Sequence, residues 1–227
     1  QNVTLAAFHV AFTLYFALSS STEVCAVLSL SYLKTKRALG RLVRFMAVIV
    51  AIPWLVAQVI AFTALGDWVF GGLFGASDAV VIQAKSTIFL LSLSAPILIT
   101  RSICFGLILM HQRTIFITYA TCVRLASLAV SLVFLPKFLE GAAVGAAALV
   151  TCMALETVVV LVFARGIFRA LPTGGEPGAE VPPTFLQQWR FSWPLMMNTS
   201  AEMGVVTVIS IFLGLSANPD LALAAFS

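Results

Sequence analysis

The chain has 227 residues, of which 61% are hydrophobic and only 10% are charged, and its formal net charge is +4. Soluble domains have roughly 45–50% apolar and about 25% charged residues, so this chain has too few charges to cover a water-exposed surface. The composition excludes a soluble enzyme, a secreted disulfide scaffold and a disordered tail. The small positive charge does not favour a nucleic-acid partner. We therefore expect an integral membrane protein surrounded by a lipid bilayer.

Six apolar stretches are long enough to cross a bilayer as helices, which takes about 20 residues. In chain order they are residues 3–33, 45–66, 86–110, 114–136, 141–164 and 191–215. They predict an all-α fold, a polytopic bundle of membrane helices. Hydroxyl residues at 19–22 should bend the first stretch, because their side chains bond to the preceding turn. Pro53, Pro96 and Pro194 predict further kinks.

Basic residues between the spans predict the orientation of the bundle. Nine of them lie in connections on one side, namely Lys34, Lys36, Arg37, Arg41, Arg44, Arg113, Arg165, Arg169 and Arg190. Only Lys85 and Lys137 lie in connections on the other side. Because cytoplasmic loops carry the excess of Lys and Arg, we expect the first side to be cytoplasmic and both observed ends to lie outside. The expected location is a plasma membrane, specifically a bacterial inner membrane.

A Pro- and Gly-rich connection between the fifth and sixth spans suggests two lobes. We interpret residues 170–186 as a cytoplasmic linker, because this composition favours irregular structure. Residues 1–169 would then be a first transmembrane lobe lacking its first helix, and residues 187–227 the start of a second. The sequence Thr-Leu-Ala-Ala-Phe at 4–8 is echoed by Ala-Leu-Ala-Ala-Phe at 222–226, as the parallel repeats of a secondary transporter would be.

Five charged residues lie inside predicted spans rather than in loops, each in a different span: Glu23, Arg101, Arg124, Glu156 and Glu202. Counted from the nearest basic residue on the cytoplasmic side, all five lie about 13–18 Å deep at 1.5 Å per helical residue. That depth is near the middle of an apolar core of about 30 Å. A charge there costs several kcal/mol, so each should face the bundle interior or a wet cavity.

The third and fourth spans should form a tight hairpin around Arg113, with Arg101 and Arg124 at matching heights on adjacent helices. These like charges would repel unless an anion lay between them, and Glu156, Glu23 or a substrate could be that anion. We predict that the two arginines bind an anionic substrate. We assign proton or cation coupling, or neutralisation of the empty site, to Glu23, Glu156 and Glu202.

Several other kinds of site are missing from the sequence. It contains neither the G-x-x-x-x-G-K-[ST] loop of an ATPase nor an H-E-x-x-H metal motif. His9 and His111 have no neighbouring ligands, and the cysteines are scattered singly in apolar spans, as packing residues are. We therefore expect no enzyme activity, no catalytic residue, no cofactor and no metal, and a transporter driven by a gradient.

The spacing of polar and small residues between Pro96 and Arg169 also carries a family resemblance. It reads Arg101-x4-Gly106-x6-Arg113-Thr114, then Arg124, Leu135-Pro136, Gly141-x3-Gly145, Glu156 and Arg169. This series resembles the progressive ankylosis protein family, within the superfamily of multidrug and toxin extruders and polysaccharide or lipid flippases. The run Arg-Phe-Ser-Trp-Pro-Leu at 190–195 resembles the start of that family's second lobe.

The resemblance implies twelve helices in two six-helix lobes with alternating access. It also implies export of a small organic or phosphate-rich anion, such as pyrophosphate, a nucleotide or citrate. The roles given above to the charged residues come from their depth and charge, not from the family. Alternatives in the same superfamily are a lipid-linked oligosaccharide flippase and a multidrug antiporter coupled to H⁺ or Na⁺. A scaffold or a lipid-modifying enzyme would be a different class, and an enzyme would need a carboxylate cluster or a metal site at the interface.

Overall fold

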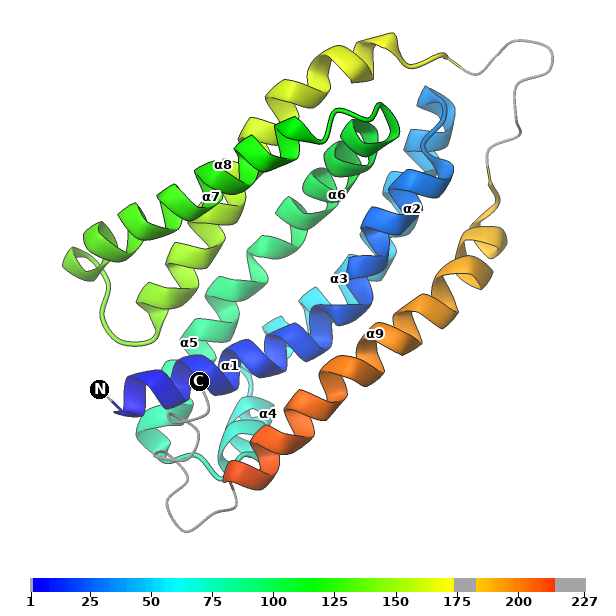
Figure 1. Ribbon diagram of the computed structural model, residues 1–227. Helices are drawn as coiled ribbons and strands as arrows, with labels where there is room; N and C mark the ends of the chain where they lie inside the picture. Colours follow the sequence, from blue (N-terminus) through cyan, green and yellow to red (C-terminus); the bar gives the residue numbers. More distant parts are fainter. Residues whose placement is uncertain (1, 174–182, 215–227) are drawn as a thin grey trace.

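A computed structural model describes residues 2–173 and 183–214, which form a bundle of helices without any strand in these ranges (Figure 1). Six helical segments are long and apolar enough to cross a membrane: Val3–Tyr32, Lys36–Phe62, Asp78–Met110, Ile115–Lys137, Ala143–Ala170 and Phe185–Leu213. The predicted all-α membrane bundle is therefore confirmed. Most of the predicted linker at 170–186, and the echo at 222–226, lie outside the described residues.

The described chain is divided into helices and short turns as follows: α1 (Asn2–Ser19), η1 (Ser20–Glu23), α2 (Val24–Tyr32), α3 (Lys36–Phe62), α4 (Ala64–Asp67), η2 (Trp68–Leu73), α5 (Asp78–Ser92), α6 (Ser94–Met110), α7 (Ile115–Phe134), η3 (Leu135–Lys137), α8 (Ala143–Ala170) and α9 (Phe185–Gly214). Three spans begin earlier than the sequence predicted, at Lys36, Asp78 and Phe185. Hydropathy detects only the apolar part of a helix. In α3 the basic first turns are also helical, and Thr35 caps them by accepting a hydrogen bond from the Ala38 amide at 3.2 Å.

The predicted bend in the first span is present, and its hydroxyl groups bond as expected. Ser20 Oγ donates to the carbonyl of Ala17 at 2.7 Å, and Thr22 Oγ1 donates to the carbonyl of Ser19 at 2.5 Å. The chain forms a 3₁₀ turn there, η1, which ends at Glu23. The third span breaks at Leu93, between α5 and α6 and shortly before Pro96. Helices α3 and α9 continue through their prolines.

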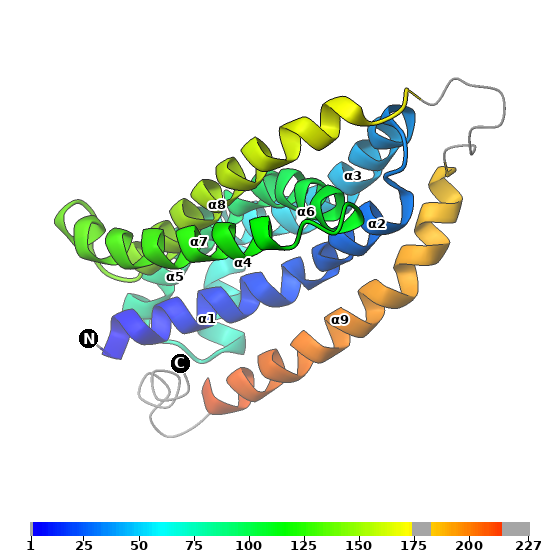
Figure 2. The ribbon, with the colours of Figure 1, turned by 45° about the horizontal axis from the view of Figure 1, so that its top comes forward.

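Helix α8 packs against both α6 and α7, whereas α6 and α7 contact each other little. Both ribbon views show α7 alongside α8 (Figures 1 and 2). The expected tight hairpin of the third and fourth spans is therefore wrong, because α8 takes the position beside each of them. The ends of α2, α6 and α8 and the starts of α3, α7 and α9 lie at one end of the bundle. We call it the basic end, since it carries the nine basic residues assigned to one side.

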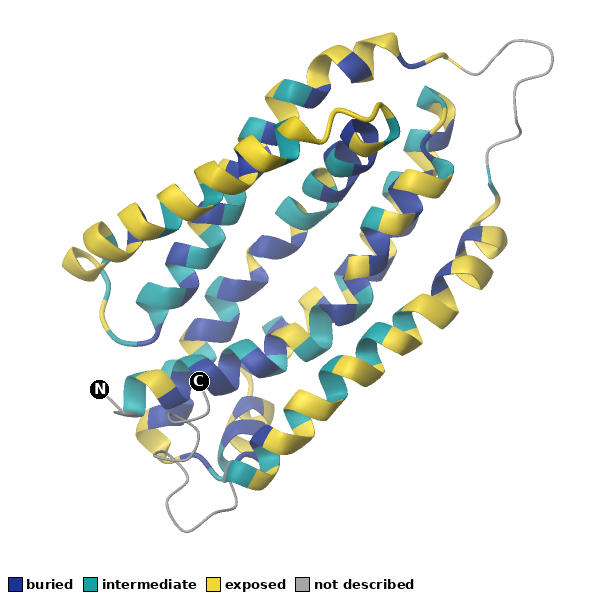
Figure 3. Cartoon of the chain, in the orientation of Figure 1, coloured by how far each residue is buried: buried dark blue, intermediate teal, exposed yellow. Residues whose placement is uncertain are grey.

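Helices α7 and α9 are the least buried spans of the described bundle (Figure 3). In α7 only Ala120 and Ser131 are buried. Helix α9 contacts α1, η1 and α2, and two of its hydroxyls make polar contacts there: Ser210 lies 3.2 Å from His9 Nε2, and Ser200 lies 3.3 Å from Ser20 Oγ. The remaining apolar surfaces of these two helices are exposed and suit contact with lipid or with another protein surface.

Gly106 lets α6 approach α2 closely. A Cβ at this position would overlap with Ser29 Cβ and would lie 3.1 Å from the Ser29 carbonyl carbon. We expect Gly106→Ala to lower the free energy of unfolding by about 1–3 kcal/mol, as overpacking does, although alanine favours helices. The control is Gly166→Ala, because a Cβ there meets nothing within 4 Å. The control should melt at the same or a higher temperature in detergent, and equal destabilisation of both variants would contradict the close packing.

Candidate functional site: a charged triad beside a central cavity

Glu156 lies between two arginines that come from different helices. Its Oε2 is 2.9 Å from Arg101 Nε and 3.9 Å from Arg124 Nη1. The three residues come from α8, α6 and α7 respectively, and they meet because α8 packs against both of the other helices. Of the three anions that the sequence analysis left open, Glu156 is therefore the one that lies between the arginines. With two cations and one anion, this triad has an excess positive charge.

The carboxylate of the triad is buried, whereas the side chains of its two arginines are partly exposed. The side chain of Glu156 is 1% exposed, against 21% for Arg101 and 38% for Arg124. Arg101 Nε and Glu156 Oε2 lie within ion-pair distance, but neither atom makes a well-aligned hydrogen bond. Their attraction is thus mainly Coulombic. The guanidinium of Arg101 also lies over the ring of Phe105, 4.8 Å from its centroid, which adds a cation–π contact.

The two arginines line a central cavity of about 490 Å³. Residues of α1, η1, α2, α3, α5, α6, α7 and α8 contribute to its wall. Its aromatic side chains are Phe12, Tyr15, Phe16, Trp54 and Phe105. The polar or charged ones, besides the Tyr15 hydroxyl, are Ser19, Thr22, Glu23, Ser94, Ser102, Arg101 and Arg124. Glu156 is not in the wall, so anything bound in the cavity would meet the guanidinium groups and not the carboxylate that holds them.

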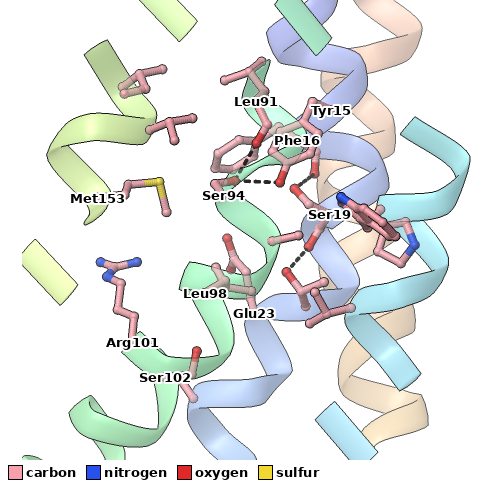
Figure 4. A pocket seen from close by; sticks show the side chains of 18 of the residues that line it. Tyr15, Phe16, Ser19, Glu23, Leu91, Ser94, Leu98, Arg101, Ser102 and Met153 are labelled. Atoms are coloured by element: carbon pink, nitrogen blue, oxygen red, sulfur yellow. Dashed lines mark hydrogen bonds between the residues drawn. The ribbon is translucent and has the colours of Figure 1, made fainter. Parts of the chain in front are cut away.

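Glu23 lines the same cavity from η1, on a different part of the chain. Figure 4 shows Glu23 and Arg101 on separate helices with both side chains at the pocket. Within the described part of the chain, no ion pair joins Glu23 to a basic side chain. When Glu23 is ionised, the two carboxylates balance the two guanidinium groups. When it is protonated, the cavity region has one net positive charge.

A hydrogen-bonded pair next to the cavity connects α1 to the start of α6. Ser94 Oγ donates to the carbonyl of Leu91 at 2.7 Å, and the Tyr15 hydroxyl donates to Ser94 Oγ at 2.7 Å (Figure 4). On the neighbouring helix α3, Gln58 Nε2 donates to Ser92 Oγ at 2.6 Å. These bonds connect α1 and α3 to the residues on either side of the helix break at Leu93.

Most of the cavity wall was not predicted from the sequence, although a signal for it was present. Tyr15, Ser19 and Glu23 are spaced four residues apart, and so are Ser94, Leu98 and Ser102 on the helix that carries Arg101. Residues at this spacing lie on one face of a helix. The helix faces that contain Glu23 and Arg101 could therefore have been predicted from the sequence. The sequence could not show that these two faces oppose each other.

Glu202 does not join this site. Its side chain is exposed on α9 and accepts a hydrogen bond from Asn198 Nδ2 at 2.9 Å within the same helix. Depth in the membrane fixes the position of a residue along its helix but not the direction of its side chain. The structure thus brings together Arg101, Arg124 and Glu156, places Glu23 in the same cavity, and leaves Glu202 apart.

The remaining candidate ligands form no cluster in the described ranges. No group of three His, Cys, Asp or Glu residues suitable for a metal occurs within 2–173 and 183–214. His111 Nδ1 lies 3.0 Å from the carbonyl of Leu107, a contact within its own helix end. All four cysteines are free thiols, and Cys122 is the exposed one.

Fold and site together define a multi-pass all-α membrane protein with a positively charged triad at a cavity between its helices. Comparison with protein-family models, with curated proteins and with solved structures gives no match to this chain.

Proposed function

We propose that this protein is a secondary active transporter that exports a small organic or phosphate-rich anion by alternating access. The observation that carries the proposal is the triad: two arginines share one buried carboxylate and still reach the cavity. The excess positive charge is thus on the accessible atoms, where it would attract an anion. The resemblance to the progressive ankylosis protein family supports the same substrate class, namely pyrophosphate, a nucleotide or citrate.

The chemistry and the size of the cavity suit such a ligand. Guanidinium groups bind carboxylates and phosphates through paired, charge-assisted hydrogen bonds. The cavity volume of about 490 Å³ falls in the range of small-molecule sites, roughly 300–1,000 Å³. A cationic drug, in contrast, would meet two like charges from Arg101 and Arg124. The cavity therefore favours an anion exporter over a cation-drug antiporter.

The two carboxylates near the cavity have different parts in this proposal. Glu156 is a positioning residue, since it lies behind the arginines and holds them without lining the cavity. Glu23 is the coupling residue, because its carboxylate is in the wall and opposes an anionic ligand when ionised. A proton or another cation at Glu23 would remove that repulsion. Glu202 lies outside the cavity and has no part in the mechanism proposed here.

We further propose that the basic end faces the cytoplasm of a bacterial inner membrane and that α9 begins a second lobe. The clustering of the nine basic residues at one end supports this orientation, because positive loops stay on the cytoplasmic side. The large exposed surface of α9, attached to the bundle along one side only, supports a partner lobe that covers it.

The experiment that tests the proposed function is an anion profile of the growth medium of bacteria that express the full-length protein. The matched variant is Ala26→Trp, because Ala26 lines the cavity and a tryptophan would fill it without changing a charge. The control is Ala126→Trp on the exposed face of α7. We expect excess pyrophosphate, nucleotide or citrate with the wild type and the control, and none with Ala26→Trp, at equal protein abundance. Equal profiles of all soluble anions would contradict an anion exporter and favour a lipid-linked oligosaccharide flippase.

A further inference from the structure

A second hollow, separate from the central cavity, lies between α3, α6 and α8. It is a groove of about 400 Å³ that shares no residue with the cavity wall. Its apolar walls include Leu39, Val43, Ile99, Ile103, Leu161 and Phe168. Helix α6 separates the two hollows. Ile99 and Ile103 face the groove, whereas Leu98, Arg101 and Ser102 face the cavity.

Positive charge gathers at the rim of this groove, at the basic end. Arg165 and Arg169 both line it and are exposed, and their spacing of four residues puts them one above the other on α8. Lys36 Nζ donates to the carbonyl of Arg169 at 3.2 Å, which places a third cation beside them. No carboxylate of the described residues forms an ion pair with either arginine. Within the described ranges, the positive charge of the rim is therefore not neutralised by an ion pair.

We propose that this groove binds a phospholipid with an anionic headgroup. Its acyl chain would lie against the apolar walls, and its phosphate would accept charge-assisted hydrogen bonds from Arg165 and Arg169. The arginines lie in the last two turns of a membrane-spanning helix, the level at which headgroups are found. Basic pockets between membrane helices on the cytoplasmic side recognise anionic lipids in this way. A free phosphate ion would use the rim but would leave the apolar walls unoccupied, so the structure favours the lipid.

The proposal is independent of transport, because it concerns binding at a different surface of the bundle. The test is native mass spectrometry of the detergent-purified full-length protein incubated with equal amounts of phosphatidylglycerol and phosphatidylcholine. We expect the wild type to retain phosphatidylglycerol in about tenfold preference, because both lipids carry the phosphate but the quaternary ammonium of phosphatidylcholine adds a positive charge close to the two arginines. The variant Arg165→Gln/Arg169→Gln should lose this preference. Since both side chains are exposed, it should remain folded, which its elution volume and melting temperature would verify.

Two further variants make the result specific to the groove. Thr100→Trp fills the groove from an exposed position and keeps both arginines, so it should release both lipids. Arg113→Gln/Arg190→Gln removes the same charge from the basic end outside the groove and should retain the preference. The proposal is overturned by a wild type without preference, or by an equal loss in this last variant, which would indicate diffuse surface attraction. Displacement of the bound lipid by millimolar inorganic phosphate would also overturn it, because the groove would then be a site for a soluble anion.

Discussion

Replacing Glu156 with alanine is expected to lower the free energy of unfolding by about 3–5 kcal/mol, the loss found when one partner of a buried ion pair is removed. The side chain is 1% exposed and faces Arg101 at 2.9 Å and Arg124 at 3.9 Å. Without the carboxylate, the two guanidinium groups would lie close together with no anion between them. The measurement is equilibrium unfolding of the full-length protein in mixed micelles, compared with the wild type.

Two further substitutions show whether the loss comes from the uncompensated charge. The double variant Arg101→Met/Glu156→Met replaces the ion pair with apolar side chains, which is often neutral or stabilising for buried pairs, so it should lose much less stability than Glu156→Ala. Arg124 is 38% exposed, so it can still be hydrated from the cavity. Equal losses in the single and double variants would refute a Coulombic origin.

An exposed ion pair in the same protein shows how much less stability such a pair contributes when solvent screens it. Lys85 Nζ lies 3.0 Å from Asp67 Oδ1, at nearly the distance of the Arg101–Glu156 pair, but the Asp67 side chain is 60% exposed. Pairs in water contribute roughly 0–1 kcal/mol, because solvent screens them. Asp67→Ala should therefore change stability by about 1 kcal/mol or less. A loss as large as that of Glu156→Ala would mean that distance, and not burial, sets the energy of these pairs.

The sequence predicted those features of the fold that depend only on position along the chain. Hydropathy located the six spans, because each must hold enough apolar residues to cross the lipid core. Hydroxyl groups located the bend at η1, because their bonding partners lie within one turn of the chain. Helix ends were less accurate. The polar first turns of α3, for example, are helical although they lie outside the apolar segment.

The site was only partly predictable, because it depends on which helices are neighbours. Depth and charge selected Arg101, Arg124 and Glu156, and the structure brings these three together. The same criteria selected Glu202, whose side chain lies outside the cavity. No local pattern showed that α8 would take the place expected for a direct α6–α7 contact. The helix face on which a charged residue lies identifies its partners only when the neighbouring helices are known.

Opposite effects on anion affinity are expected from two substitutions in the cavity wall. Arg124→Gln should weaken binding by about tenfold or more, because one charge-assisted hydrogen bond to the ligand is lost. Arg124 is the better choice for this test, since it is 38% exposed and 3.9 Å from Glu156, whereas Arg101 is the closer partner of that carboxylate. Glu23→Gln should strengthen binding, because it removes a negative charge from the wall. The measurement is equilibrium binding of radiolabelled pyrophosphate to the purified full-length protein.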